Sequence, residues 1–135
     1  GTLQGAAPFV SHVLYSFAPD FSCFHFHASR LARHTRNLEQ DPLVALMIAR
    51  ADTGEEDPQQ LPRLSITGDV HVVPPSAENY EAARSAYLER FPRAQMHFQL
   101  GDFALYRIEP RKARYVAGFG QIFRLRPEDL QAASG

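Results

Sequence analysis

The sequence predicts one mainly β domain, an antiparallel barrel with peripheral helices. Three observations favour this fold class. The chain has 135 residues, and chains usually divide into separate cores only above roughly 250 residues. Alternating apolar and polar segments recur along it, whereas few segments have the 3.6-residue period of a helix. The order strands, helix, strands, helix, strands, with connections that suit hairpins, favours a barrel over an alternating α/β sheet.

The N-terminal segments predict a hairpin of two strands. Residues Pro8–Ala18 are rich in Val, Phe, Leu and Tyr, and the turn signal Pro19-Asp20 follows them. In Cys23–His27 the two phenylalanines alternate with the cysteine and the two histidines, so they occupy opposite faces of a second strand.

The first helix is predicted to begin at Ser29, a good N-cap residue, and to end at Asp41-Pro42. The short apolar run Val44–Ala49 has the length of a strand, and the polar residues 51–62 predict an exposed loop. Arg63–Val73 shows the clearest alternation of the chain, which indicates a strand with one solvated face.

A second helix is predicted from its cap at Ser76 to Phe91-Pro92. Asp102–Ile108 then alternates, which predicts a strand with Phe103 and Leu105 buried. Pro110 marks a turn, and two further short strands are expected in the segments 114–116 and 118–123, followed by a helical tail from residue 126.

Charge and composition exclude several classes of partner. Fourteen Lys plus Arg against fifteen Asp plus Glu give a net charge of -1, which predicts neither nucleic-acid nor anionic-membrane binding. No apolar run approaches the ~20 residues that span a bilayer. The single cysteine, Cys23, has no partner for an internal disulfide, so a cytoplasmic setting is expected rather than a secreted one.

The strongest candidate site is the segment from His27 to Asn37, where a strand leads into a helix that carries three arginines. Amides at a helix start, the Ser29 hydroxyl and the Arg30 guanidinium would together suit an anion. The alternative is that Ser29 only caps the helix and that the arginines coat a solvated face. The residues alone favour that alternative.

Other chemistry has weaker support in the sequence. His25 and His27 lie two apart on one strand face, but no third ligand follows at a zinc spacing, so no metal site is predicted. Cys23 has no recognisable base beside it. The motifs of serine hydrolases, P-loop NTPases and dinucleotide-binding folds are absent from the sequence.

Five short motifs, taken in order, resemble the flavin-binding split barrels related to pyridoxamine-phosphate oxidase, and more closely the branch that includes haem-utilisation proteins. The resemblance covers residues 5–124. The motifs are the segments 29–38 (with Asp41-Pro42), 63–68, 87–92, 102–106 and 118–120. Each is unspecific alone, and their order and spacing carry the resemblance.

The resemblance implies a homodimer that holds flavin mononucleotide (FMN) as a small-molecule ligand in the groove between two barrels. It implies that Ser29 and Arg30 meet the flavin phosphate and that Arg63 lies beside the isoalloxazine ring. Three further residues, Ser16, His34 and Asn37, complete the expected set of cofactor contacts.

The chain also departs from the family pattern. Oxidases carry an Arg and a Lys on the first strand, whereas residues 11–16 offer only the hydroxyls of Ser11 and Ser16 as comparable donors. The Arg-x-His pattern near the oxidase C-terminus is missing. Haem-degrading relatives use a histidine of a C-terminal extension, and the last histidine here is His97.

Three functions therefore remain open. The first is an FMN-binding protein, specifically a flavin-dependent oxidoreductase of unknown substrate. The second is a haem-binding or haem-utilisation module of the same cleft, with His25, His27 or His34 as candidate ligands. The third is a cofactor-free dimer that acts as an interaction module.

Overall fold

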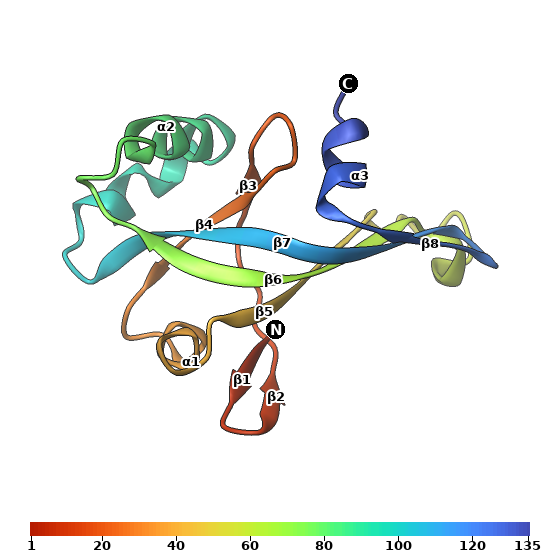
Figure 1. Cartoon of the computed structure of the whole chain (residues 1–135), viewed down its shortest axis with the longest axis horizontal. Helices are drawn as coiled ribbons and strands as arrows, with labels where there is room; N and C mark the ends of the chain where they lie inside the picture. The colour runs from red at the N-terminus through yellow and green to blue at the C-terminus, as the bar shows by residue number, and fades with distance from the viewer.

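The computed structural model describes all residues, Gly1–Gly135, and its main feature is a six-stranded antiparallel sheet (Figure 1). The strands follow the spatial order β3–β4–β7–β6–β5, and β8 also pairs with β7. Two short strands, β1 and β2, form a separate hairpin. The bounds are β1 Thr2–Gln4, β2 Ala7–Phe9, β3 Ser16–Phe17, β4 Phe24–Ser29, β5 Leu43–Ala49, β6 Arg63–Val73, β7 Phe103–Gly118 and β8 Gln121–Leu125. The mainly β antiparallel prediction is confirmed.

Short helices lie around this sheet. They are α1 Arg33–Gln40, α2 Tyr80–Arg90 and α3 Pro127–Ala132, with 3₁₀ turns at Pro58–Gln60 and Pro92–Gln99. In Figure 1, α1 and α2 lie on opposite sides of one end of the sheet, and α3 lies near β8. None of the helices is long and apolar enough to cross a membrane.

The long strand β7 organises the barrel. Its first half pairs with β4, its second half pairs with β8, and β6 runs along most of its length. The turn expected at Pro110 is wrong, because Pro110 lies inside β7, opposite Gly68 at an irregularity of the ladder. A proline is tolerated there because a bulge already interrupts the ladder hydrogen bonds that its missing N–H would have made.

The single strand predicted over Pro8–Ala18 is also wrong. Only β2 and β3 form within it, and residues 10–15 make no backbone hydrogen bond with another backbone group. At the free edge of β5, Gly1 exchanges two backbone hydrogen bonds with Ala45. The segment 10–15 lines a groove together with β5 and makes no backbone hydrogen bond to it.

The predicted starts of two helices need correction. Ser29 is the last residue of β4, and α1 has Ala32 at its N-cap with no side-chain cap. The strand continues this far because Ser29 still pairs with Phe103 of β7, and tertiary pairing overrides a local cap signal. The second helix begins after Asn79 rather than at Ser76.

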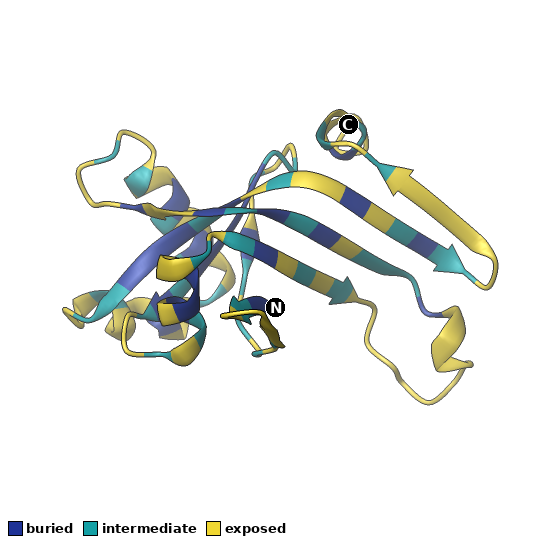
Figure 2. Cartoon of the chain, turned by 60° about the horizontal axis from the view of Figure 1, so that its bottom comes forward, coloured by how far each residue is buried: buried dark blue, intermediate teal, exposed yellow.

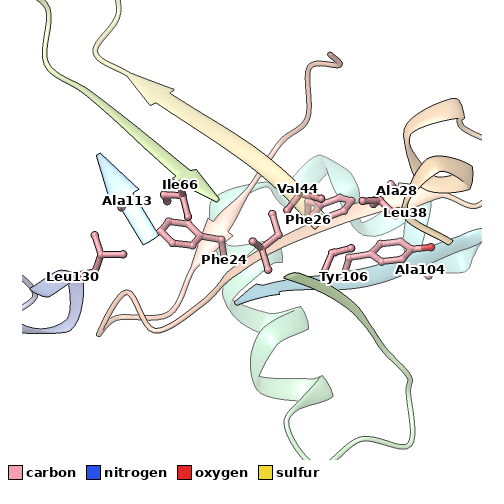
Figure 3. Packing of buried hydrophobic residues seen from close by; sticks show 12 residues of the cluster. Phe24, Phe26, Ala28, Leu38, Val44, Ile66, Ala104, Tyr106, Ala113 and Leu130 are labelled. Atoms are coloured by element: carbon pink, nitrogen blue, oxygen red, sulfur yellow. The ribbon is translucent and has the colours of Figure 1, made fainter. Parts of the chain in front are cut away.

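Two hydrophobic clusters lie on opposite faces of the sheet. The larger one fills the inner face, where Phe26 stacks on Tyr106 with ring centroids 5.0 Å apart (Figure 3). The smaller one joins Val73 and Leu105 to Ala83 of α2. Leu105 is buried as predicted, whereas Phe103 is only partly buried. Figure 2 shows buried and exposed positions alternating along the strands, as expected for a sheet with one solvated face.

The C-terminal end of α2 is held to the β3 region by a cation. The Arg90 guanidinium lies 5.3 Å from the ring centroid of Tyr15, 5.5 Å from Phe17 and 5.4 Å from Phe91. Each such contact at an exposed site contributes roughly 0.5–1 kcal/mol. We expect Arg90→Met to lower the free energy of unfolding by about 1–2 kcal/mol in urea titrations. Arg93→Met is the control, since Arg93 is exposed and contacts no ring. Equal effects would contradict the cation–π assignment.

Candidate functional site

A groove of about 730 Å³ lies beside the free edge of β5. Twelve of its eighteen lining residues are hydrophobic. Its walls come from β5, from the unpaired segment 10–15 and from α1, and its floor includes the core residues Phe26 and Ile108. A mostly apolar concavity of this size with few polar groups is typical of a small-molecule site.

His34 is a polar residue of this groove whose Nε2 atom is buried. It lies on α1, and its Nε2 atom is buried without a hydrogen bond. Burial lowers the pKa of His34 below its usual value, and the nearby Gly1 ammonium lowers it further. The ring is therefore kept neutral, which is the form in which an imidazole nitrogen binds a metal ion.

Asn37 and Ser16, two of the expected cofactor contacts, are buried within the fold. The Asn37 amide donates a hydrogen bond of 2.9 Å to the Thr2 hydroxyl, and this ties α1 to β1. Ser16 is buried opposite His25 in the β3–β4 pair, and its hydroxyl has no partner. Neither residue lines the groove.

Ser29 and Arg30 lie together but outside the groove. The Ser29 hydroxyl donates a 2.6 Å hydrogen bond to the Asp102 carboxylate and accepts one from the Leu31 amide. Arg30 is exposed. A carboxylate bonded to Ser29 repels an incoming phosphate, so this end of β4 is less suited to an anion than the sequence indicated.

Arg63 lies far from that pair in the same chain. Arg63 is opposite Val116 and Ser29 is opposite Phe103, roughly 40 Å apart along β7 at about 3.3 Å per residue. The Arg63 guanidinium donates to the Gln59 and Leu61 carbonyls at 3.1 and 3.3 Å. One chain therefore does not bring all the expected cofactor residues to one ligand, and only His34 lies in the large groove.

The other two candidate histidines lie on the outer face of the sheet. His25 is buried, with its Nε2 atom 3.9 Å from the Cys23 sulfur, and desolvation followed by the Arg107 charge lowers its pKa. His27 stacks on Phe98 with ring centroids 3.7 Å apart. Burial, followed by the charge of His97, lowers the pKa of His27 to about 4. No group of three His, Cys, Asp or Glu side chains is placed to hold a metal ion.

Sequence reasoning missed the β5 wall of the groove. Ala45, Met47 and Ala49 are exposed, although the run Val44–Ala49 is continuously apolar. A continuous apolar run indicates a strand buried on both faces, but β5 pairs only with β6 and leaves its other edge free. The continuous apolar run was the signal available in the sequence, and the structure shows that part of this run lines a groove instead of a closed core.

Comparison with known proteins shows the family to which the barrel belongs. The family model described as "CREG, beta-barrel" matches residues 3–130. The chloroplastic heme oxygenase HOZ of Arabidopsis thaliana is 40% identical over 111 residues, which cover 78% of this chain and 32% of that protein. The heme oxygenase HutZ of Vibrio cholerae is 32% identical over 103 residues, which cover 76% of this chain and 58% of that protein. The chain thus spans less than two thirds of either relative.

Solved structures share the same fold. A heme binding protein from Mycobacterium smegmatis has a TM-score of 0.86 at 25% identity, covering 97% of this chain and 52% of that one. Similar structures also include a pyridoxamine 5'-phosphate oxidase candidate from Listeria innocua, at a TM-score of 0.64 and 14% identity, covering 87% of this chain and 85% of that one. At that identity the likeness shows the fold alone. It confirms the split-barrel architecture.

Proposed function

The chain belongs to the CREG β-barrel family, and on that premise we propose that it is a haem-binding module whose ligand lies in the groove beside β5. The observation that carries the proposal is the unpartnered, buried Nε2 atom of His34 in a mostly apolar groove. The names of the relatives HOZ and HutZ support haem as the ligand class. This proposal favours the second of the three functions that the sequence left open.

The groove fits the chemistry of haem. Haem is a broad apolar macrocycle, and iron in haem proteins is commonly held by a neutral imidazole. His34 would hold the iron, and the apolar side chains of β5 and of the segment 10–15 would exclude water from the macrocycle. When bound, haem supplies oxygen and electron-transfer chemistry that amino-acid side chains lack.

FMN is the less well supported ligand. The phosphate contacts expected at Ser29 and Arg30 lie beside the Asp102 carboxylate. Arg63 lies at the opposite end of β7 and bonds to its own loop. A flavin that used both ends would need residues from two protomers. Flavin-dependent oxidoreductase activity therefore rests on the fold likeness alone.

A second copy of the chain is our proposal for what covers the projecting half of the sheet. There Phe119 is 82% exposed, and Ile122 and Phe123 are about half exposed. Figure 2 shows this half extending away from the helices α1 and α2. Exposed apolar surface of this kind marks an interaction site. Sedimentation at micromolar protein should show a dimer. A concentration-independent monomer would contradict the proposal that a second copy covers this half of the sheet.

Haem titration tests the proposed function. We expect the protein to bind ferric haem with an absorption spectrum typical of imidazole ligation. His34→Ala should weaken haem binding by at least about tenfold, since loss of a ligand costs no less than loss of its supporting contacts. His71→Ala is the matched control, because His71 is exposed on β6 and does not line the groove.

The outcomes separate the possibilities clearly. Unchanged haem affinity and spectrum in His34→Ala would remove His34 as the ligand. An equal loss in His34→Ala and His71→Ala would indicate nonspecific haem adsorption. A protein that binds no haem at all would reject the proposed function.

A further inference from the structure

One straight row of exposed side chains crosses four strands on the outer face of the sheet. In register, Met47 of β5 lies opposite Ser65 of β6, Ser65 opposite Arg114 of β7, and Arg114 opposite Arg124 of β8. All four residues are exposed, so they share the solvated face. Met47 and Ser65 also line the groove. The row therefore leads from the groove to a pair of arginines.

The two arginines have no counter-ion within the chain. None of the six ion pairs includes Arg114 or Arg124, and neither side chain makes a hydrogen bond. Lys112, two residues from Arg114 on the same exposed face, is likewise unpaired. Like charges directly opposite each other destabilise a sheet. The chain therefore keeps an unfavourable cationic cluster at one place on its surface.

Two other arginines of β7 have acidic partners within the chain. Arg111 pairs with Asp69 at 2.5 Å, and Arg107 pairs with Glu109 at 3.1 Å. The same strand thus carries two arginines neutralised by acidic partners and two cations, Lys112 and Arg114, that are left free. Of these two free cations, Arg114 belongs to the row that leads from the groove, and Lys112 lies two residues away from it.

We propose that Arg114 and Arg124, with Lys112 beside them, bind the anionic end of the ligand whose apolar part lies in the groove. The inference rests on the proposed function and adds the ligand's second point of attachment. Adjacent strands are about 4.8 Å apart, so the Arg114 backbone lies about 10 Å from that of Met47. A flat ligand seated at the groove can span that distance. Guanidinium groups bind carboxylate and phosphate groups with paired hydrogen bonds.

The chemistry required of the ligand is an apolar ring system with a carboxylate or phosphate at one edge. Haem offers carboxylates and FMN offers a phosphate. The test therefore uses two matched ligand pairs: haem against haem dimethyl ester, and FMN against riboflavin. The second member of each pair lacks the anionic group.

The variants are Arg114→Gln and Arg124→Gln, with Arg93→Gln as a control that removes an exposed, unpaired arginine elsewhere. We expect wild-type protein to prefer haem over its ester. We call Arg114 and Arg124 the clamp. Each clamp variant should lose roughly tenfold or more in haem affinity, which corresponds to the free energy of one hydrogen bond to a charged group. Affinity for the ester should hardly change. The control should bind both ligands as wild-type protein does.

A second readout needs no ligand. Since the two arginines repel each other, Arg124→Gln should raise the melting temperature of the unliganded protein, whereas Arg93→Gln should leave it unchanged. A higher melting temperature combined with weaker haem binding is the signature of residues kept for binding at the expense of stability. A lower melting temperature would show that Arg124 supports the fold, and this would overturn the proposal.

The titrations also distinguish this inference from the proposed function. Haem binding that the clamp variants leave unchanged, or weaken equally for haem and its ester, overturns the clamp alone. Absence of haem binding, together with FMN binding that exceeds riboflavin binding and depends on Arg114 and Arg124, overturns the haem proposal and supports the clamp. A wild-type protein that binds neither ligand overturns both.

Discussion

Gly68→Ala is expected to destabilise the protein by about 3 kcal/mol or more, because a side chain at this position has no space. A Cβ atom there would lie 2.3 Å from the Glu109 carbonyl oxygen and 2.9 Å from its carbonyl carbon. Both contacts are with the backbone of β7, which cannot rotate away as a flexible side chain does. The two central strands would have to separate at the irregularity between Thr67 and Gly68. Urea unfolding measures the loss.

Gly101→Ala is the matched control for this prediction. A Cβ atom added at Gly101 would meet nothing within 4 Å, so the substitution should be neutral or slightly stabilising. If Gly68→Ala cost less than about 1 kcal/mol, the close approach of β6 and β7 at the bulge would be wrong. A Gly68→Ala protein that is recovered only as aggregates, beside a soluble Gly101→Ala protein, would agree with a large loss.

The sequence predicts local strands well where one face is buried and the other is wet. The bounds expected for Arg63–Val73 agree with β6, and the run Val44–Ala49 differs from β5 by one residue. The strand β6 lies between β5 and β7, which support its alternation, whereas β5 was predicted from its continuous apolar run. The second helix ends close to its expected position because Phe91-Pro92 stops it by local chemistry.

The errors arise where distant pairing overrides local signals. Pro110 is a turn residue by its own chemistry, but the bulge opposite Gly68 accommodates it within β7. Ser29 is a good N-cap residue, but its pairing with Phe103 keeps it in a strand. Neither partner can be recognised from the local sequence, because each lies many residues away.

The same reasoning separates the candidate site residues. The expected cofactor contacts came from a short motif and a family likeness, and neither states which residues of one chain meet. The structure brings His34 into the groove and leaves Arg63 at the far end of β7. The cationic pair Arg114 and Arg124 depends on the register of β7 with β8, which the sequence predicts only as two adjacent short strands.

Mild acid is expected to destabilise the protein through His27. The pKa of this residue is lowered to about 4 in the folded state, first by burial and then by the charge of His97. Its ring stacks on Phe98 and also lies near Tyr87 and Phe103. Its Nδ1 atom is buried without a partner. A proton on this ring would therefore be placed between aromatic side chains with no group to receive its hydrogen bond.

The sign of the effect follows from proton linkage. An unfolded histidine titrates near 6.5, so between about pH 4 and pH 6.5 the unfolded chain binds a proton that the folded chain does not. The contribution of His27 is complete above that range and is lost as the pH falls through it. After allowance for solvent screening of a partly exposed ring, we expect a loss of about 1–2 kcal/mol from this residue. Urea titrations at pH 7.5 and pH 4.5, both chosen to bracket most of the window, measure it.

His27→Phe isolates this residue from the other histidines whose pKa is lowered by burial, His25 and His34. Phenylalanine keeps a ring against Phe98 but binds no proton, so the variant should lose less stability than wild-type protein between the two pH values. His71→Gln serves as the control, because His71 is exposed and its ring stacks on no aromatic neighbour. Its pH dependence should match that of wild-type protein. If His27→Phe and wild-type protein lost stability equally on acidification, the acid sensitivity would belong to other groups, and the contact between the Pro92–Gln99 turn and β4 would not be its origin.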